Sequence, residues 1–575
     1  MKDNAEGRSA RRAEVDKERS QSNRARLHSS AFSLLPSLSF LLLLCFIAYY
    51  SILNSYFLSD DFVQVGRVLK GDWSVVWGRE HGGFFRPLFI LSYVVDSRVW
   101  GGRPLGYHLT NVLVHGLNSY LVYRLSLPLF HPQSLSEEST RRIGLVTSLL
   151  FLLHPSHTEA VSWISGRADL LATLFSLAAL LACIFYMGSR RARYLLVSLL
   201  CFALALLAKE SAASLPIIIF AVGIYLAAAA GERGKTAFVV AVKTSALFFL
   251  LLLLFVVVRR AALGTWLGGY GAEQHLNFSP GWVRDRFLQA SLRALFPVMP
   301  PELSAILLKP LKSTAFIIFT LGSIALIVFL LRRRRLSDEK ATRSRQNRLA
   351  LLLLAAFVLS LLPVINLRLS LFDTQGERFI YWPSVFAVLL ITHLGFVLIG
   401  GGKWRLGLAL CLLAFYSVSL HRTNQRWREA AETSRSIKEE LVPGASGEQS
   451  LIVINAPDNL RGIPVFHNGL QEALTTFQDN GPSPEARVLS LHSIQSLNDG
   501  AELKMEGDAF TLRLANREDA FTKIAEGVNC VEIQERSGGA FRFRLQNCPP
   551  GSALYFFNAG RMYRVIGNER NGASF

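Results

Sequence analysis

The chain has 575 residues, of which 51% are hydrophobic, and its apolar residues gather in repeated runs long enough to cross a membrane. Large soluble enzymes do not carry that many runs, so the composition excludes this class and predicts a polytopic α-helical membrane protein. The net charge of +19 would also suit a nucleic-acid-binding protein. However, the Lys and Arg residues lie mostly between the apolar runs, as orientation signals do, and no basic patch alternates with stacking aromatics, so we expect no nucleic-acid partner.

Residues 1–30 are polar and basic, which predicts a disordered cytoplasmic tail. The stretch is too long and too charged for the start of a signal peptide. Residues 31–421 are predicted to form a membrane domain of about eleven transmembrane helices. The expected spans are 31–53, 106–126, 143–155, 168–187, 193–208, 212–230, 236–258, 313–331, 348–366, 379–399 and 404–421.

The charges of the loops predict the orientation. With the N-terminus in the cytoplasm, the basic stretches 188–194, 231–235, 332–348 and 400–405 all fall on the cytoplasmic side. The same count places the C-terminus and the long loop 259–312 on the outer side. It also places the unusual polar clusters of the chain together on the outer face. Polar groups that converge on one membrane face indicate an active site.

Asp60 and Asp61 follow the first span and are the first of these clusters. One interpretation is that they cap the helix that FVQVGRVLKG would form, since Asp is a favoured N-cap residue. The functional interpretation divides the work between them: one carboxylate binds a cation or an acceptor hydroxyl, and the other accepts a proton as a general base. The residues alone leave both interpretations open.

The remaining clusters each have a structural alternative. Arg86 precedes a proline, which presents its guanidinium rigidly, or it is an interfacial arginine. The stretch HPSHTEAVSWISGRADL holds two histidines, whose spacing is disturbed by Pro155, so that hydrogen bonding to a phosphate or a sugar is favoured over metal binding. Lys209 and Glu210 interrupt an apolar stretch, and a structural ion pair is the alternative for them. Glu377 and Arg378 open a span, and an interfacial anchor is the alternative for them. The candidate residues of these clusters are Arg86, His154, His157, Glu159, Arg167, Asp169, Lys209, Glu210, Glu377 and Arg378.

Residues 422–575 are predicted to form a small extracytoplasmic domain, mostly β, with a helix near GLQEALTTF. Strands are expected at LIVINAP, ARVLSLHS, AFTLRLA, NCVEIQE, GAFRFRLQ and ALYFFNAGRMYRVI, several of which alternate apolar and polar residues. The domain contains Cys530 and Cys548. They form a disulfide or stay free, which their separation in the sequence does not decide.

Four stretches together carry a resemblance: FFRPLFILSYVVDSRVWGGRPLGYHLTNVLVHGLNSYLVYRL, LLFLLHPSHTEAVSWISGRADLLATLFSLAALL, LLAKESAASLP and ERFIYWPSVFAVLL. They resemble the membrane portion of the transmembrane and tetratricopeptide-repeat-containing O-mannosyltransferases, within the GT-C-fold glycosyltransferases that use polyprenyl-phosphate sugars. The resemblance covers about residues 31–420. It implies a GT-C-like fold and transfer of a sugar, with mannose favoured, from a polyprenyl-phosphate donor to an acceptor hydroxyl on the outer face.

Carried onto this sequence, the resemblance implies that Asp60 or Asp61 is the catalytic acidic residue. It also implies that the cleft is lined by Arg86, His154, His157, Glu159, Arg167, Asp169, Lys209, Glu210 and Arg378. Charge alone singles out Arg86, Lys209 and Arg378 as partners of the carrier phosphate. We expect inversion at the anomeric carbon. A divalent cation, Mg²⁺ or Mn²⁺, bridging the two aspartates is one alternative, and neutralisation by basic residues alone is the other.

The resemblance ends before residues 422–575, which lack the period of tetratricopeptide repeats. The resemblance implies protein Ser/Thr as the acceptor, and the missing repeats leave a lipid or a glycan as the alternative. A flippase of lipid-linked sugars and a non-catalytic scaffold are the alternatives outside the enzyme class. We expect an integral protein of a bacterial cytoplasmic membrane.

Overall fold

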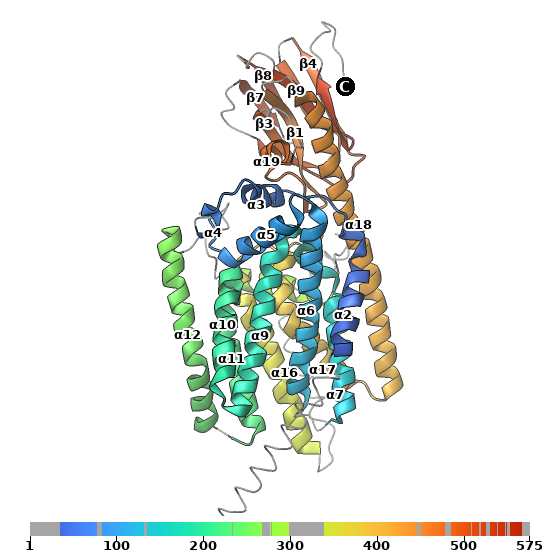
Figure 1. The fold of residues 1–575 in the computed structure, drawn as a ribbon. Helices are drawn as coiled ribbons and strands as arrows, with labels where there is room; N and C mark the ends of the chain where they lie inside the picture. Colours follow the sequence, from blue (N-terminus) through green and yellow to red (C-terminus); the bar gives the residue numbers. More distant parts are fainter. Residues whose placement is uncertain are drawn as a thin grey trace, which may run out of the picture.

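The computed structural model describes residues 35–77, 83–131, 135–232, 234–266, 277, 279–297, 339–445, 450–477, 485–507, 509–516, 519–524, 530–537, 539–546, 548 and 552–565. The N-terminal tail and the predicted span 313–331 lie outside these residues. Within them, a bundle of long helices carries a β domain at one end (Figure 1).

The bundle contains the helices α2 (Leu35–Ala48), α6 (Pro104–Phe130), α7 (Glu137–Leu152), α9 (Arg167–Ser189), α10 (Ala192–Ala208), α11 (Leu215–Ala229), α12 (Lys235–Leu263), α16 (Glu339–Leu361), α17 (Tyr381–Leu398) and α18 (Gly402–Ala445). Every predicted span other than 313–331 overlaps one of these helices. In the described part of the chain, six helices are long and apolar enough to cross a membrane. The total of about eleven spans stays a prediction.

The outer faces of the bundle are apolar. Leu200 on α10, Leu250 on α12 and Leu410 on α18 each expose more than half of their surface. Exposing rows of such side chains to water would be unfavourable, whereas lipid tails solvate them. The interior is packed with buried side chains such as Phe151 and Leu180. The helices therefore form an integral membrane protein.

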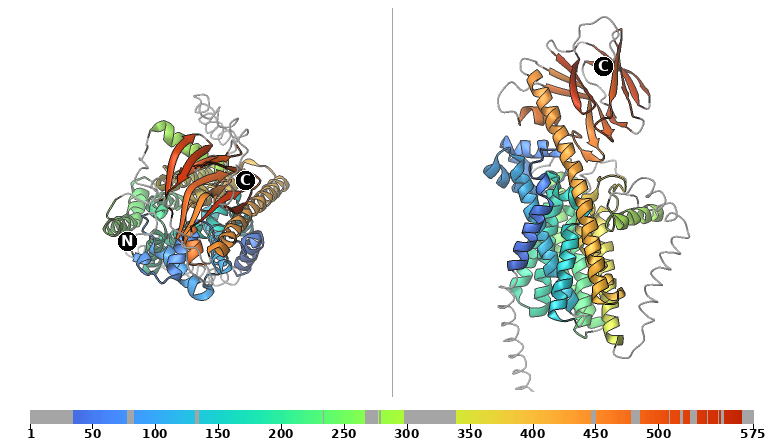
Figure 2. Two further views of the ribbon diagram at one scale, coloured as in Figure 1. Left: turned by 90° about the horizontal axis from the view of Figure 1, so that it is seen from above. Right: turned by 90° about the vertical axis from the view of Figure 1, so that its right-hand side faces the viewer.

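Short elements cover the end of the bundle that faces the β domain. They are α3 (Asp60–Leu69), α4 (Ser74–Trp77), α5 (Pro87–Trp100), α8 (Thr158–Val161) and the 3₁₀ turns Pro155–His157, Ile164–Gly166, Glu210–Ser214 and Glu377–Ile380. Pro87 occupies the first turn of α5, where a missing N–H costs nothing. Beside the bundle, α13 (Pro280–Arg293) lies across the direction of the long helices (Figure 2). The polar clusters singled out in the sequence fall in or next to these short elements, apart from Arg167 and Asp169, which lie in the first turn of α9.

Helix α18 joins the two parts of the molecule without a break. It runs for 44 residues along the bundle and into the β domain (Figures 1 and 2). The predicted domain boundary after residue 421 therefore falls inside a helix. Beyond that point the sequence stays helical because Arg428–Glu432 and Arg435–Glu439 pair at i, i+4 on its outer face. Buried apolar residues, including Trp427, cover its inner face.

The β domain consists of two sheets. The larger has the order β10-β9-β1-β3-β6, with β2 paired to β1, and the smaller has the order β4-β5-β8-β7. The strands are β1 (Ser450–Leu460), β2 (Ile463–Pro464), β3 (Glu485–Ile494), β4 (Ala501–Glu506), β5 (Ala509–Leu514), β6 (Ala520–Ile524), β7 (Val531–Ser537), β8 (Ala540–Leu545), β9 (Ser552–Asn558) and β10 (Arg561–Val565). The helix α19 (Leu470–Thr475) lies where the sequence predicts one. A strand forms at each predicted place, and the stretch ALYFFNAGRMYRVI forms two, the antiparallel pair β9 and β10. Strands β2, β4 and β6 are additional to the prediction.

Strand β1 separates two cores. Ile452 and Ile454 point toward the smaller sheet, and Leu451 and Val453 point toward a cluster that includes residues of α18 and α3. This alternation follows from the period of two in a strand and docks the larger sheet on the membrane part. At the far side of the domain, Cys530 and Cys548 are both free thiols. The Cys548 Sγ–H donates to the Cys530 carbonyl oxygen at 3.4 Å.

Candidate functional site

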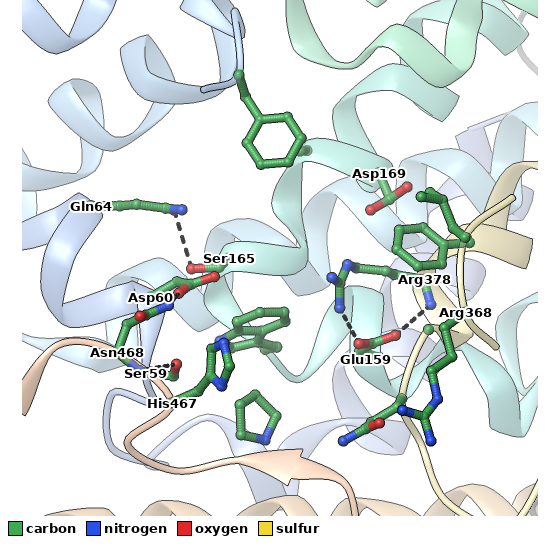
Figure 3. Close-up of a pocket in the computed structure, with 18 of the residues that line it drawn as sticks. Ser59, Asp60, Gln64, Glu159, Ser165, Asp169, Arg368, Arg378, His467 and Asn468 are labelled. Carbon is green, nitrogen blue, oxygen red and sulfur yellow. Dashed lines mark hydrogen bonds and ion pairs between the residues drawn. The ribbon is translucent and has the colours of Figure 1, made fainter. Parts of the chain in front are cut away.

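A pocket of about 420 Å³ lies between the short elements of the membrane part and the β domain (Figure 3). The membrane part contributes α3, α5, the turn before α9 and the segment 367–379 to its walls. The β domain contributes the end of β1 and the loop that follows it. The polar and charged residues that line it are Ser59, Asp60, Gln64, Arg86, Glu159, Ser165, Asp169, Lys209, Arg368, Gln375, Arg378, Asp458, Asn459, His467 and Asn468. The pocket therefore unites groups that are far apart in the sequence.

The structure separates the two adjacent aspartates. Asp60 begins α3, lines the pocket and accepts a hydrogen bond from Asn468 Nδ2 at 2.8 Å. Asp61 is 1% exposed and does not line the pocket. Its carboxylate accepts hydrogen bonds from Leu58 N at 3.1 Å, from Ser165 N at 2.8 Å and from the Ser165 hydroxyl. Burial raises the pKa of Asp61 to about 7, although these donated hydrogen bonds act in the opposite direction.

Three ion pairs form the wall opposite Asp60, and they join residues that the sequence analysis singled out separately. Arg86 donates to both carboxylate oxygens of Glu210, at 3.1 and 2.9 Å. Lys209 Nζ lies 2.6 Å from Asp169 Oδ2, and Arg378 pairs with Glu159. Burial raises the pKa of Glu159, and the charge of Arg378 lowers it in part. Charge compensation explains why this many ionised groups tolerate burial beside a membrane.

Of the residues expected to line the cleft, five do so: Arg86, Glu159, Asp169, Lys209 and Arg378. Glu210 contacts the lining through Arg86. The functional roles of all these residues stay predictions.

His154, His157 and Arg167 do not line the pocket, so the expectation for them is wrong in position. His154 Nε2 hydrogen bonds to the Ala294 carbonyl at 2.9 Å, and His157 Nε2 to the Ser384 hydroxyl at 2.8 Å. Arg167 Nη1 lies 2.6 Å from Asp96 Oδ2 in a fully buried ion pair. These side chains hold the helices together, because buried polar groups require such partners.

Sequence reasoning missed nine of the polar lining residues, and four of these carry or share the charges of the pocket: Arg368, Asp458, His467 and Asn468. Three of these four lie in PDNLRGIPVFHNG, which forms the end of the buried strand β1 and the glycine-containing segment after it; such a polar stretch is a signal for a functional loop. Arg368 lies in an irregular segment without any such signal. Among the described residues, no carboxylate lies within ion-pair distance of Arg368. Burial, and then the charge of Arg368, lower the pKa of the nearby Arg286.

A cation shared by the two aspartates does not fit this geometry, because Asp61 uses its oxygens for three protein donors. Within the described residues, no group of three or more His, Cys, Asp or Glu side chains is placed to hold a metal ion. We therefore assign no step to a metal.

His467 provides a pH-dependent contact at the edge of the pocket. Its Nδ1 lies 2.6 Å from Asp458 Oδ1, and this hydrogen bond raises the pKa of His467 above 6.5, with burial opposing. A raised pKa means that the pair stabilises the fold at pH below 6.5, and that this contribution is lost as the pH rises through the folded value. We expect His467→Gln to lower the melting temperature more at about pH 6 than at about pH 8.5. An equal decrease at both values would contradict this.

No profile of a known protein family matches the chain. Among curated proteins, it is 32% identical to the protein O-mannosyl-transferase Tmtc1 of Drosophila melanogaster over 188 residues, which are 29% of this chain and 20% of that protein. It is 31% identical to the protein O-mannosyl-transferase F38B6.6 of Caenorhabditis elegans over 159 residues, 25% of this chain and 22% of that protein. The protein O-mannosyl-transferase TMTC4 of Mus musculus matches over 103 residues at 38% identity, 17% of this chain and 14% of that protein.

The chain is a distant homologue of these protein O-mannosyltransferases. It spans about a fifth of the length of the curated relatives. Among solved structures, ArnT from Cupriavidus metallidurans bound to undecaprenyl phosphate aligns with a TM-score of 0.40 and 12% identity, over 78% of this chain and 90% of that chain.

Proposed function

We propose that this protein is a membrane glycosyltransferase that moves a sugar, with mannose favoured, from a polyprenyl-phosphate donor to an acceptor hydroxyl. The observation that carries the proposal is the pocket of Figure 3, in a homologue of protein O-mannosyltransferases: a carboxylate, Asp60, faces a wall of arginine and lysine side chains at the end of the membrane helices. A lipid-linked donor requires a site at that depth. Protein Ser/Thr is the favoured acceptor, with a lipid or a glycan as the alternative.

Asp60 is the proposed general base. It accepts the proton of the acceptor hydroxyl as the oxygen attacks the anomeric carbon, and the bond between that carbon and the phosphate oxygen breaks. The phosphate departs with the bonding electrons, so negative charge develops on the side away from Asp60. Direct attack of this kind inverts the anomeric carbon.

The ion pairs of the pocket change which residue we propose as the first contact of the donor phosphate. Arg86, Lys209 and Arg378 each have a carboxylate partner, which cancels most of their charge at a distance. Arg368 has none among the described residues and faces the same pocket (Figure 3). We therefore assign Arg368 the first contact with the phosphate, because an uncompensated guanidinium stabilises developing negative charge most. The paired cations line the remainder of the wall.

Arg368→Gln is expected to weaken binding of the donor by about tenfold, since a charge-assisted hydrogen bond is lost. The measurement is a titration of purified protein with a polyprenyl-phosphate sugar. Arg405→Gln is the control, because Arg405 lies in the first turn of α18, at the end of the bundle away from the pocket, and donates to the Ile399 carbonyl. Equal donor affinity in Arg368→Gln and in the wild type would refute the assignment.

The orientation is proposed with the pocket on the extracytoplasmic side of a bacterial cytoplasmic membrane. The basic stretches 188–194, 231–235 and 400–405 adjoin the helix ends away from the pocket, as the positive-inside tendency predicts for cytoplasmic loops. Labelling of single introduced cysteines from either side of sealed vesicles tests this orientation.

The function is tested by incubating the reconstituted protein with radiolabelled polyprenyl-phosphate sugars and three acceptor pools: Ser/Thr peptides, lipid extract and glycans. Labelled product, or slow release of free sugar, identifies a transferase and its acceptor. If the donor crosses the bilayer intact and no sugar is released, the protein is a flippase. If the donor does not bind at all, the scaffold alternative replaces the enzyme.

A further inference from the structure

One segment of the β domain, Val465 to Gly469, contacts the start of α3 directly, and we call it the clamp segment. Ser59 N donates to the Val465 carbonyl at 2.9 Å, and Asn468 N donates to the Ser59 hydroxyl at 3.2 Å. Asn468 also donates from Nδ2 to Asp60 Oδ1 at 2.8 Å. Figure 3 shows Ser59, Asp60 and Asn468 together on one side of the pocket. Two consecutive residues of the membrane part are thus hydrogen bonded to the β domain.

The backbone at Ser59 needs this support. Its φ is 47° with ψ at −114°, a conformation that residues other than glycine rarely adopt. Such a conformation persists only where the surroundings hold it, and it is typical of functional sites. The hydrogen bonds of Ser59 to Val465 and Asn468 supply that hold. Without them, Asp60 would lose its position relative to the pocket.

Gly469 ends the clamp segment and allows its close approach. Its φ is +86°, and a Cβ atom there would lie 2.6 Å from the Ser59 carbonyl oxygen and 2.9 Å from Phe62 Cβ. Both are closer than real Cβ contacts, so only glycine fits without displacing α3. Phe466 of the clamp segment stacks on Phe62 with 5.6 Å between ring centroids. The packing therefore fixes the first turn of α3 against the β domain.

We propose that the clamp segment makes the β domain part of the active site, with Asn468 as the positioning residue for Asp60. The amide of Asn468 fixes the direction of the Asp60 carboxylate, which is the group that accepts the proton of the acceptor hydroxyl. This inference rests on the proposed function of Asp60. It gives the β domain a chemical role that the similarity to the O-mannosyltransferases does not assign.

The first test compares the kcat of sugar transfer and the KM for the donor in Asn468→Ala and the wild type. Without the hydrogen bond from Asn468 Nδ2, the Asp60 carboxylate is free to rotate out of line with the acceptor hydroxyl. We therefore expect kcat to fall about tenfold while the KM for the donor stays at the wild-type value. Asn498→Ala, an exposed residue of the same domain, is the control. A loss that appears only in the KM for the donor, or no loss, would overturn the positioning role.

The second test uses two glycines of the β domain that both have positive φ. Gly469→Ala is expected to lower transfer at least tenfold, because its methyl group displaces Ser59. Gly507→Ala carries the same backbone strain at φ +66°, with nothing within 4 Å of its Cβ, and is expected to keep wild-type transfer. Equal rates for the two variants would show that contact with Ser59 is irrelevant.

A third measurement tests the contact without turnover. Melting temperatures of Asp60→Ala, Asn468→Ala and the double variant form a cycle, and the double variant should lose less than the sum of the single losses. Additive losses would refute the contact. If the wild type turns over no donor while the cycle shows coupling, the proposed function has failed and the Asn468 role in catalysis fails with it. If the wild type is active and Asn468→Ala keeps the wild-type kcat, only the present inference fails.

Discussion

Asp60→Asn is expected to lower sugar transfer by a factor of about 10² to 10⁴, the range for losing a general base. The substitution keeps the shape of the side chain and an oxygen that accepts from Asn468 Nδ2, so the pocket should stay intact. Donor binding should therefore be preserved while turnover is lost. Initial rates with a radiolabelled donor, together with a donor titration, separate the two quantities.

Asp61→Asn is the matched control, because it makes the same chemical change at the neighbouring residue. Leu58 N–H and Ser165 N–H donate to different oxygens of Asp61, and an amide keeps only one oxygen, so one of the two N–H groups would face the NH₂ group and lose its acceptor. We expect a loss of about 1–3 kcal/mol in the free energy of unfolding, from an unsatisfied buried donor. A folded, inactive Asp61→Asn beside an active Asp60→Asn would exchange the roles of the two aspartates.

Arg167→Met is expected to lower the free energy of unfolding by about 3–5 kcal/mol, because it leaves the buried Asp96 carboxylate without its counter-charge. Arg167 also donates to Asn111 Oδ1 at 2.7 Å and to the Tyr107 carbonyl at 2.8 Å, and it is fully buried. The substitution removes all three contacts at once. Thermal unfolding in detergent measures the effect.

Two further variants separate charge from packing at this position. Arg141→Met removes an exposed i, i+4 ion pair with Glu137, and it should cost no more than about 0.5 kcal/mol. Arg167→Met combined with Asp96→Leu removes both buried charges and should recover much of the stability that the single substitution loses. A double variant that is less stable than Arg167→Met would show that packing, rather than the unpaired charge, dominates.

The apolar runs predicted the helices well, because burial in lipid imposes a strong and local pattern. The strands of the β domain could be predicted as well: β1 from its continuous apolar run, and strands such as β8 from the alternation of apolar and polar residues. The predicted boundary at residue 421 falls inside α18 for a local reason: the polar half of α18 keeps a helical period, so a change from apolar to polar residues does not end the helix.

The residue types of the candidate site could be predicted from the sequence, but which residues pair with one another could not. Arg86 and Glu210 are 124 residues apart, and no local pattern tells that they meet. His154 and His157 have the residue types of a site, yet their ring nitrogens are used by backbone and hydroxyl groups of neighbouring segments. Arg368 and Asn468 lie in irregular segments, whose position is set by tertiary packing alone.

The continuity of α18 has a consequence for how this chain can vary in length. At 44 residues it is a rod of about 66 Å. Its register is fixed at both parts, since Ser434 Oγ donates to the Phe57 carbonyl and Glu440 accepts from Met562 N. One inserted residue would rotate the β domain about the helix axis by about 100°. Seven inserted residues would restore its orientation to within about 20° but move it about 10 Å further from the membrane part. The number of residues in α18 therefore sets both the distance and the orientation of the β domain relative to the pocket, so we expect insertions and deletions in this helix to be poorly tolerated.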